Sequence, residues 1–113
     1  MAKIASRKIK AESGNEYDFN VYPYPTNFKS LAGVYVVSKR YKDGAIFRHT
    51  NLYVGITDDM KERHDNHERQ EDFEAADANS ISFHREDSKE AREKIEEDLL
   101  ANGKKWPLNR QRS

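Results

Sequence analysis

The sequence predicts an α+β domain in which a small three-stranded antiparallel sheet is flanked by helices, in the order β-β-α-β-α. Two Val- and Tyr-rich segments, residues 32–39 and 51–55, are expected to be strands, because β-branched and aromatic residues favour extended backbone. Lys42-Asp43-Gly44 between them is a turn signal, which favours an antiparallel hairpin. Such a hairpin can bring Tyr35 and Tyr53 together on one face.

The first helix is expected from Thr57 to about Phe73. Thr57 is a suitable N-cap, and the two aspartates that follow it lie in the first turn, where negative charge is favourable. Arg63 and His67 are four residues apart, so this helix should present both side chains on one face.

The third strand and the second helix follow. Residues 80–84 alternate in polarity, as a half-buried strand does. Asp87 and Glu90 form a capping pattern for the next helix, whose apolar stripe contains Ile95 and Leu99. Asn102-Gly103 is expected to end that helix.

The 113 residues suffice for one domain with a single modest core. Residues 1–26 are expected to form an N-terminal arm, with a short extended segment at 17–24 that two prolines stop, and residues 27–113 to form the domain. The absence of cysteine excludes disulfides and thiolate metal sites and suits the cytoplasm. No stretch is apolar enough to span a membrane, so we expect no membrane partner.

The net charge is zero, but it is unevenly distributed. Residues 32–55 carry four basic side chains and one acidic side chain, whereas residues 56–79 carry three basic and nine acidic ones. A dedicated nucleic-acid-binding domain is usually basic, which argues against tight, sequence-independent DNA binding by this chain alone. Candidates for contact with a phosphate backbone lie near the C-terminal end: Lys104, Lys105 and Arg110.

Two short motifs and three later features occur in a fixed order. Gly33-Val34-Tyr35 is followed by Tyr53-Val54-Gly55, then by Arg63 and His67, and finally by Pro107-Leu108-Asn109 after a Glu-rich segment. In combination these residues resemble the GIY-YIG endonuclease family over roughly residues 27–109. The tripeptides match its two motifs, Arg63 matches its phosphate-binding arginine, and His67 matches a histidine found in part of the family. The spacing between the two motifs is longer than usual.

The resemblance implies a metal-dependent endonuclease that hydrolyses phosphodiester bonds in DNA, with RNA as the alternative substrate, using one Mg²⁺ or Mn²⁺ ion. Either Tyr35 or Tyr53 would act on the attacking water. Arg63 would bind the phosphate, His67 would handle a proton or a phosphate oxygen, and Asn109 would set the geometry of the site.

The resemblance also implies one metal-binding glutamate. Glu97 has the commoner distance to Asn109, but Glu96 fits the local apolar pattern better and is our choice, with Glu97 as the alternative. No separate DNA-binding domain is visible, so a protein partner could supply recognition. The competing interpretation is a catalytically inactive module of the same fold that binds nucleic acid or protein. Ile56, at a position where several family members have Lys or Thr, favours it.

Overall fold

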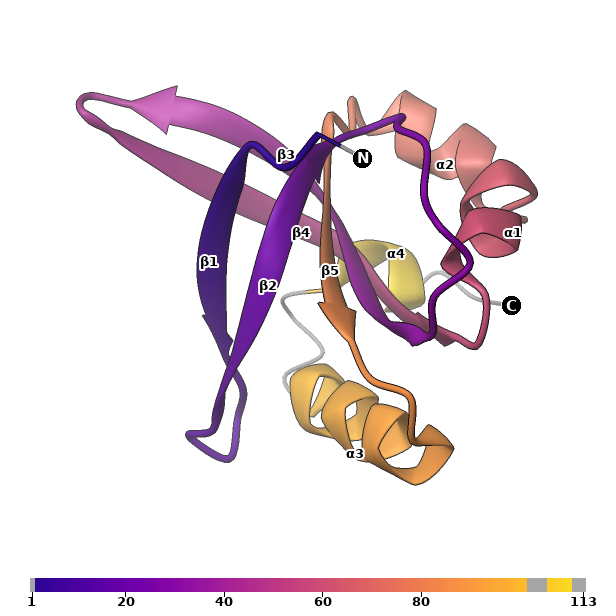
Figure 1. Ribbon diagram of the computed structural model, residues 1–113. Helices are drawn as coiled ribbons and strands as arrows, with labels where there is room; N and C mark the ends of the chain where they lie inside the picture. Colours follow the sequence, from indigo (N-terminus) through magenta and orange to yellow (C-terminus); the bar gives the residue numbers. More distant parts are fainter. Residues whose placement is uncertain (1, 102–105, 111–113) are drawn as a thin grey trace.

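The computed structural model describes residues 2–101 and 106–110, and its main feature is one antiparallel sheet (Figure 1). The sheet has five strands in the order β1-β2-β5-β3-β4. In chain order the strands are β1 (Ala5–Lys10), β2 (Glu16–Pro23), β3 (Gly33–Asp43), β4 (Ile46–Thr57) and β5 (Ser80–Arg85). The helices are α1 (Met60–Asp65), α2 (Gln70–Ala75), α3 (Lys89–Leu100) and α4 (Pro107–Arg110). None of the helices in these ranges is long and apolar enough to cross a membrane.

The prediction of a three-stranded sheet flanked by helices was wrong. The sheet is a curled, half-barrel-like structure of five strands, and the helices beside it are short. The difference comes from the segment that was expected to be an arm, which contributes β1 and β2. Tyr22 of β2 pairs with Ile81 of β5, so this hairpin extends the sheet. Phe19 and Val21 are buried, and their burial explains why the segment packs.

The expected hairpin of residues 32–39 and 51–55 is present but much longer, because β3 and β4 stay paired as far as Asp43 and Ile46. Tyr35 lies opposite Gly55 in this pair. The expected third strand corresponds to β5, which pairs with β3 and places Tyr35 opposite Phe83.

The expected helix from Thr57 to Phe73 is two helices, α1 and α2. Thr57 is the last residue of β4, and Asp59 is the actual N-cap, since its Oδ1 accepts the Glu62 N–H at 3.2 Å. Asn66 caps the C-terminus of α1. The intervening residues 66–69 are not α-helical, so the side chain of His67 is placed by a connection rather than by a helix.

The helix that was expected to follow Asp87 is α3, and it begins one residue later than expected. Ser88, not Asp87, is its N-cap, with Oγ accepting the Ala91 N–H at 3.2 Å. The predicted stop at Asn102-Gly103 lies outside the described residues. Ile95 and Leu99 of α3 are buried as expected.

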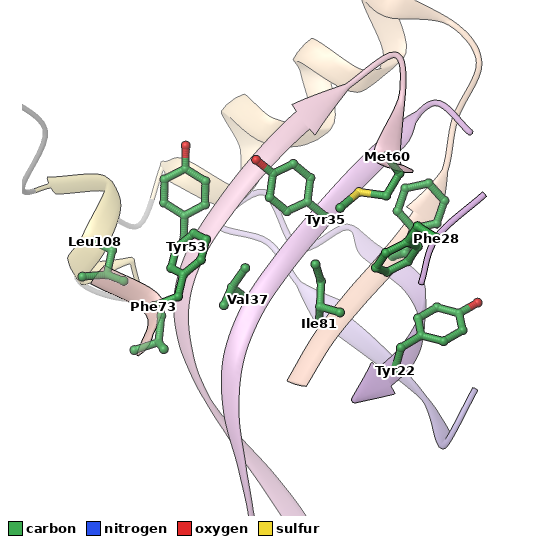
Figure 2. Packing of buried hydrophobic residues seen from close by; sticks show 11 residues of the cluster. Tyr22, Phe28, Tyr35, Val37, Tyr53, Met60, Phe73, Ile81 and Leu108 are labelled. Atoms are coloured by element: carbon green, nitrogen blue, oxygen red, sulfur yellow. The ribbon is translucent and has the colours of Figure 1, made fainter. Parts of the chain in front are cut away.

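Each face of the sheet carries an apolar cluster. One face holds Tyr35, Val37 and Tyr53 against Phe73 of α2 and Leu108 of α4 (Figure 2). The opposite face holds Val34, Val36 and Val54 against α3, with Trp106 fully covered. The first face is the one that carries both predicted site tyrosines.

Candidate functional site

The two tyrosines stand on neighbouring strands with their hydroxyl groups on the same side (Figure 2). Their ring centroids are 6.2 Å apart. The ring of Tyr35 lies directly over Gly55, where an added Cβ would come within 2.5 Å of Tyr35 Cζ. Gly55 is therefore required for close packing, and it lets Tyr35 reach across the pair of strands.

His67 contacts both tyrosines. Its Nε2 lies 2.7 Å from Tyr35 Oη, in a buried hydrogen bond. The imidazole ring stands edge-on to Tyr35, at 5.7 Å between centroids, and to Tyr53, at 5.3 Å. Sequence reasoning placed His67 on one helical face with Arg63, and the break between α1 and α2 corrects that expectation.

The protonation of His67 follows from its surroundings. Burial lowers the pKa of His67 to about 4, and the charges of Arg63 and Arg69 act in the same direction. The ring is therefore neutral near pH 7. Its Nδ1 accepts the Arg69 N–H at 3.0 Å, so the single ring proton resides on Nε2. His67 consequently donates a hydrogen bond to the oxygen of Tyr35.

The protonation of Tyr35 is set by its burial and by the charges of other predicted site residues. Burial raises the pKa of Tyr35, as do the neighbouring phenol of Tyr53 and the charge of Glu96, whereas the charge of Arg63 opposes these effects. Tyr35 is only 2% exposed and stays protonated near neutral pH. The electrostatic influence of Arg63 and Glu96 on one hydroxyl places both charged groups in its neighbourhood.

Arg63 contributes a cation to this cluster, since its charge acts on both Tyr35 and His67. It is half-buried on α1, and its Nε is buried without a hydrogen-bond partner among residues 2–101 and 106–110. Two carboxylates of the acidic segment around it pair with other cations: Asp72 binds Arg69 at 2.6 Å and Asp65 binds Lys61 at 3.4 Å. A buried, unsatisfied guanidinium N–H is suited to an anionic ligand.

The structure separates the two candidate glutamates. Glu96 is half-buried, and its charge acts on Tyr35, whereas Glu97 is exposed. Adjacent helical residues point about 100° apart, so only one of them can face the tyrosines. No group of three or more His, Asp or Glu side chains suited to a metal occurs among the described residues. A single carboxylate fits Mg²⁺ or Mn²⁺, because Mg²⁺ keeps several waters when one or two carboxylates bind it.

Asn109 contacts the edge of the sheet rather than the tyrosine hydroxyls. Its Oδ1 accepts the Val54 N–H at 2.9 Å, and its Nδ2 donates to the Val54 carbonyl at 2.9 Å. The side-chain amide thus pairs with edge strand β4 as a neighbouring strand would. Since Val54 follows Tyr53, Asn109 fixes the backbone that carries one of the tyrosines.

Three predicted nucleic-acid contacts cannot be placed in the site. Lys104 and Lys105 lie outside the described residues, as does the side chain of Arg110.

Arg69 belongs to the site, and the sequence analysis missed it. Its backbone N–H donates to His67, and its guanidinium lies 5.8 Å from the ring centroid of Tyr53. Only the helix break brings Arg69 there, so its spacing in the sequence carried no signal.

Residues that are far apart in the sequence thus bring a neutral imidazole against one pair of phenols, within the electrostatic influence of a guanidinium and a carboxylate. This set can bind an anion, hold one divalent ion and order a water molecule. Comparisons with protein-family models, curated proteins and solved structures found no match to this chain.

Proposed function

We propose that this protein is a metal-dependent endonuclease of the GIY-YIG type, which hydrolyses phosphodiester bonds in DNA. One observation carries the proposal: the buried Tyr35–His67 hydrogen bond lies within the electrostatic reach of Arg63 and Glu96. These groups come from β3, the α1–α2 connection, α1 and α3. The charge of Arg63 acts on both members of this hydrogen bond, Tyr35 and His67, which supports a role for its guanidinium beside them.

Each side chain has a role in this reaction. Arg63 binds the scissile phosphate and stabilises the charge that develops on it. His67 donates a hydrogen bond from its Nε2–H to Tyr35 Oη and so fixes the orientation of that hydroxyl. Tyr35, which is protonated near neutral pH, orders the attacking water by hydrogen bonding. Its raised pKa means that it becomes a base only where additional positive charge stabilises the phenolate.

Glu96 is the residue that would hold Mg²⁺ or Mn²⁺. A bound divalent ion supplies positive charge to the phosphate and to the leaving oxygen. Asn109 maintains the position of the strand that carries Tyr53. The absence of cysteine suits a reaction in the cytoplasm, and a protein partner could contribute recognition.

A second candidate function is a nucleic-acid-binding or protein-binding module without turnover. The observation in its favour is the burial of both phenols, since Tyr35 is 2% and Tyr53 is 6% exposed. Ile56, next to the second motif, also lacks a hydrogen-bonding side chain.

Cleavage of supercoiled plasmid tests the endonuclease, with Mg²⁺ or Mn²⁺ present and with EDTA as the blank. Glu96→Ala and Glu97→Ala form a matched pair, because they remove the same charge from adjacent positions of one helix. Glu97→Ala is expected to cut like the wild type, while Glu96→Ala and Arg63→Ala lose about 10²-fold or more of the rate. Equal loss in both glutamate variants, or cutting that persists in EDTA, would contradict the assignment. A folded wild type that cuts no plasmid supports the binding module.

A further inference from the structure

The β3–β4 hairpin extends well beyond the body of the sheet (Figure 1). β3 is paired with β5 only as far as Ser38, which lies opposite Ser80, whereas β3 and β4 remain paired to Asp43 and Ile46. Residues 39–50 therefore form a two-stranded ribbon with no third strand beside it. The ribbon accounts for the long spacing between the two tyrosine motifs.

The ribbon is basic in a chain whose net charge is zero. It contains four cations and one carboxylate, Asp43, which pairs with Arg48 at 2.6 Å. The other three cations, Lys39, Arg40 and Lys42, make no ion pair among the described residues. Close to them lie large apolar side chains that are exposed: Tyr41 (42%), Ile46 (52%) and Phe47 (53%).

Both faces of the ribbon combine an aromatic ring with cations. Tyr41 lies opposite Arg48, so these two share one face. Lys42 lies opposite Phe47 on the other face, where the Arg40 guanidinium is 3.8 Å from the centroid of the Phe47 ring. A surface of this kind, present on both sides of a narrow ribbon, suits a partner that encloses it.

The base of the ribbon is firmly attached. The Asn79 side chain accepts the Arg40 N–H at 2.6 Å and donates to the Arg40 carbonyl at 2.9 Å. Ser38 Oγ lies 2.9 Å from His49 Nδ1 and 3.2 Å from Ser80 Oγ. These contacts fix the direction in which the ribbon leaves the sheet, and hence its position relative to the tyrosines.

We propose that residues 39–50 are a ribbon that binds duplex DNA in a groove. The major groove admits a two-stranded β-ribbon, and its phosphate walls attract the unpaired cations on both faces. The exposed rings and Ile46 then contact sugars and base edges, and an apolar side chain at such a tip can also wedge between base steps. The choice of DNA over RNA rests on the proposed nuclease function.

The geometry also predicts where the ribbon binds relative to the cleaved bond. Asp43 lies eight residues after Tyr35 along β3, which corresponds to ~27 Å of extended strand. At ~3.4 Å per base pair, the ribbon tip therefore contacts the duplex at most roughly eight base pairs from the scissile phosphate.

Fluorescence anisotropy with a short labelled duplex tests the ribbon, with EDTA present so that no cleavage occurs. The test variant is Lys39→Gln/Lys42→Gln, and the control is Lys89→Gln/Lys94→Gln, which removes the same charge from exposed positions of α3. The test variant is expected to bind about tenfold more weakly than the control and to reduce the slope of log affinity against log salt by about 2. Tyr41→Ser/Phe47→Ser is expected to weaken binding without changing that slope.

Equal affinity of the test and control variants, or no salt-dependent duplex binding by the wild type, would overturn the proposal; the second result would favour a protein partner. The two proposals fail separately. A chain that binds through the ribbon but cuts nothing refutes only the nuclease, whereas a chain that cuts, and whose ribbon variants bind and cut like the wild type, refutes only the ribbon.

Discussion

Arg7 and Asn51 connect the two opposite edges of the sheet. Arg7 Nη2, on β1, donates to Asn51 Oδ1, on β4, at 2.7 Å. Because β1 and β4 are the first and last strands in the sheet order, this hydrogen bond joins the two edge strands of the curled sheet. Burial lowers the pKa of Arg7 to about 10, so the guanidinium remains charged near neutral pH. A hollow of about 300 Å³, partly lined by Trp106, lies beside the contact.

Asn51→Ala should destabilise the fold by about 1–3 kcal/mol, because it leaves a largely buried guanidinium N–H without its acceptor. The midpoint of urea unfolding measures the effect. Lys8→Ala is the control, since Lys8 is the exposed neighbour of Arg7 on the same strand. The two edges would not be linked energetically if both variants unfolded at the same urea concentration.

Gly55→Ala should destabilise the protein by about 1–3 kcal/mol, because the added methyl group overlaps the ring of Tyr35. The same substitution in a Tyr35→Val background should cost much less, since the ring is then absent. Urea unfolding of the four proteins gives the coupling energy of this pair. Purely additive effects would show that Gly55 is required for some reason other than Tyr35.

Asn109→Asp should be more damaging than Asn109→Ala. Alanine removes two hydrogen bonds to Val54, with a net cost of about 1–3 kcal/mol, whereas aspartate also places a carboxylate against the Val54 carbonyl. Hydrogen exchange at the Val54 amide measures the loss directly. Unchanged protection of that amide in Asn109→Ala would contradict the pairing of α4 with β4.

The stability of the protein should fall as the pH drops from about 6.5 to about 4. The pKa of His67 is about 4 in the folded protein and close to 6.5 in an unfolded chain, so the unfolded state binds more protons in this window. The stabilisation is fully present above pH 6.5, and His67 alone accounts for a loss on the order of 2 kcal/mol. Burial shifts the pKa of His49 in the same direction, also to about 4.

Urea unfolding of the wild type and His67→Gln at several pH values tests this dependence. The variant should lose stability less steeply below pH 6.5, and measurements at pH 8, where the histidine is neutral in both states, provide the baseline. Identical slopes in the two proteins would mean that His67 is not protonated on unfolding.

Local patterns predicted much of the hairpin and of the site. Val- and Tyr-rich segments around a turn fix the β3–β4 pair, whose register brings Tyr35 and Tyr53 together. The apolar stripe of α3 leaves Glu96 half-buried and Glu97 exposed, in line with the local pattern on which Glu96 was preferred; its role as a metal ligand stays a prediction. Both inferences depend on residues close together in the chain.

Long-range pairing and helix interruption could not be predicted in this way. The pairing of Tyr22 with Ile81 joins segments that are distant in sequence, and no local signal specifies it. The helical spacing of Arg63 and His67 continues through Asn66, where the backbone leaves the helix, so periodicity alone misplaced His67. The contact of Asn109 with Val54 becomes foreseeable only when β4 is known to be an edge strand.

The pairing of the Asn109 side chain with β4 has a consequence for biosynthesis. Asn109 is translated 55 residues after Val54, so roughly 3–11 s of elongation pass before the amide that covers this edge exists. During that interval β4 exposes a peptide group that a strand of another nascent chain can pair with. Translation speed over the last half of the chain is therefore expected to influence the yield of correctly folded protein.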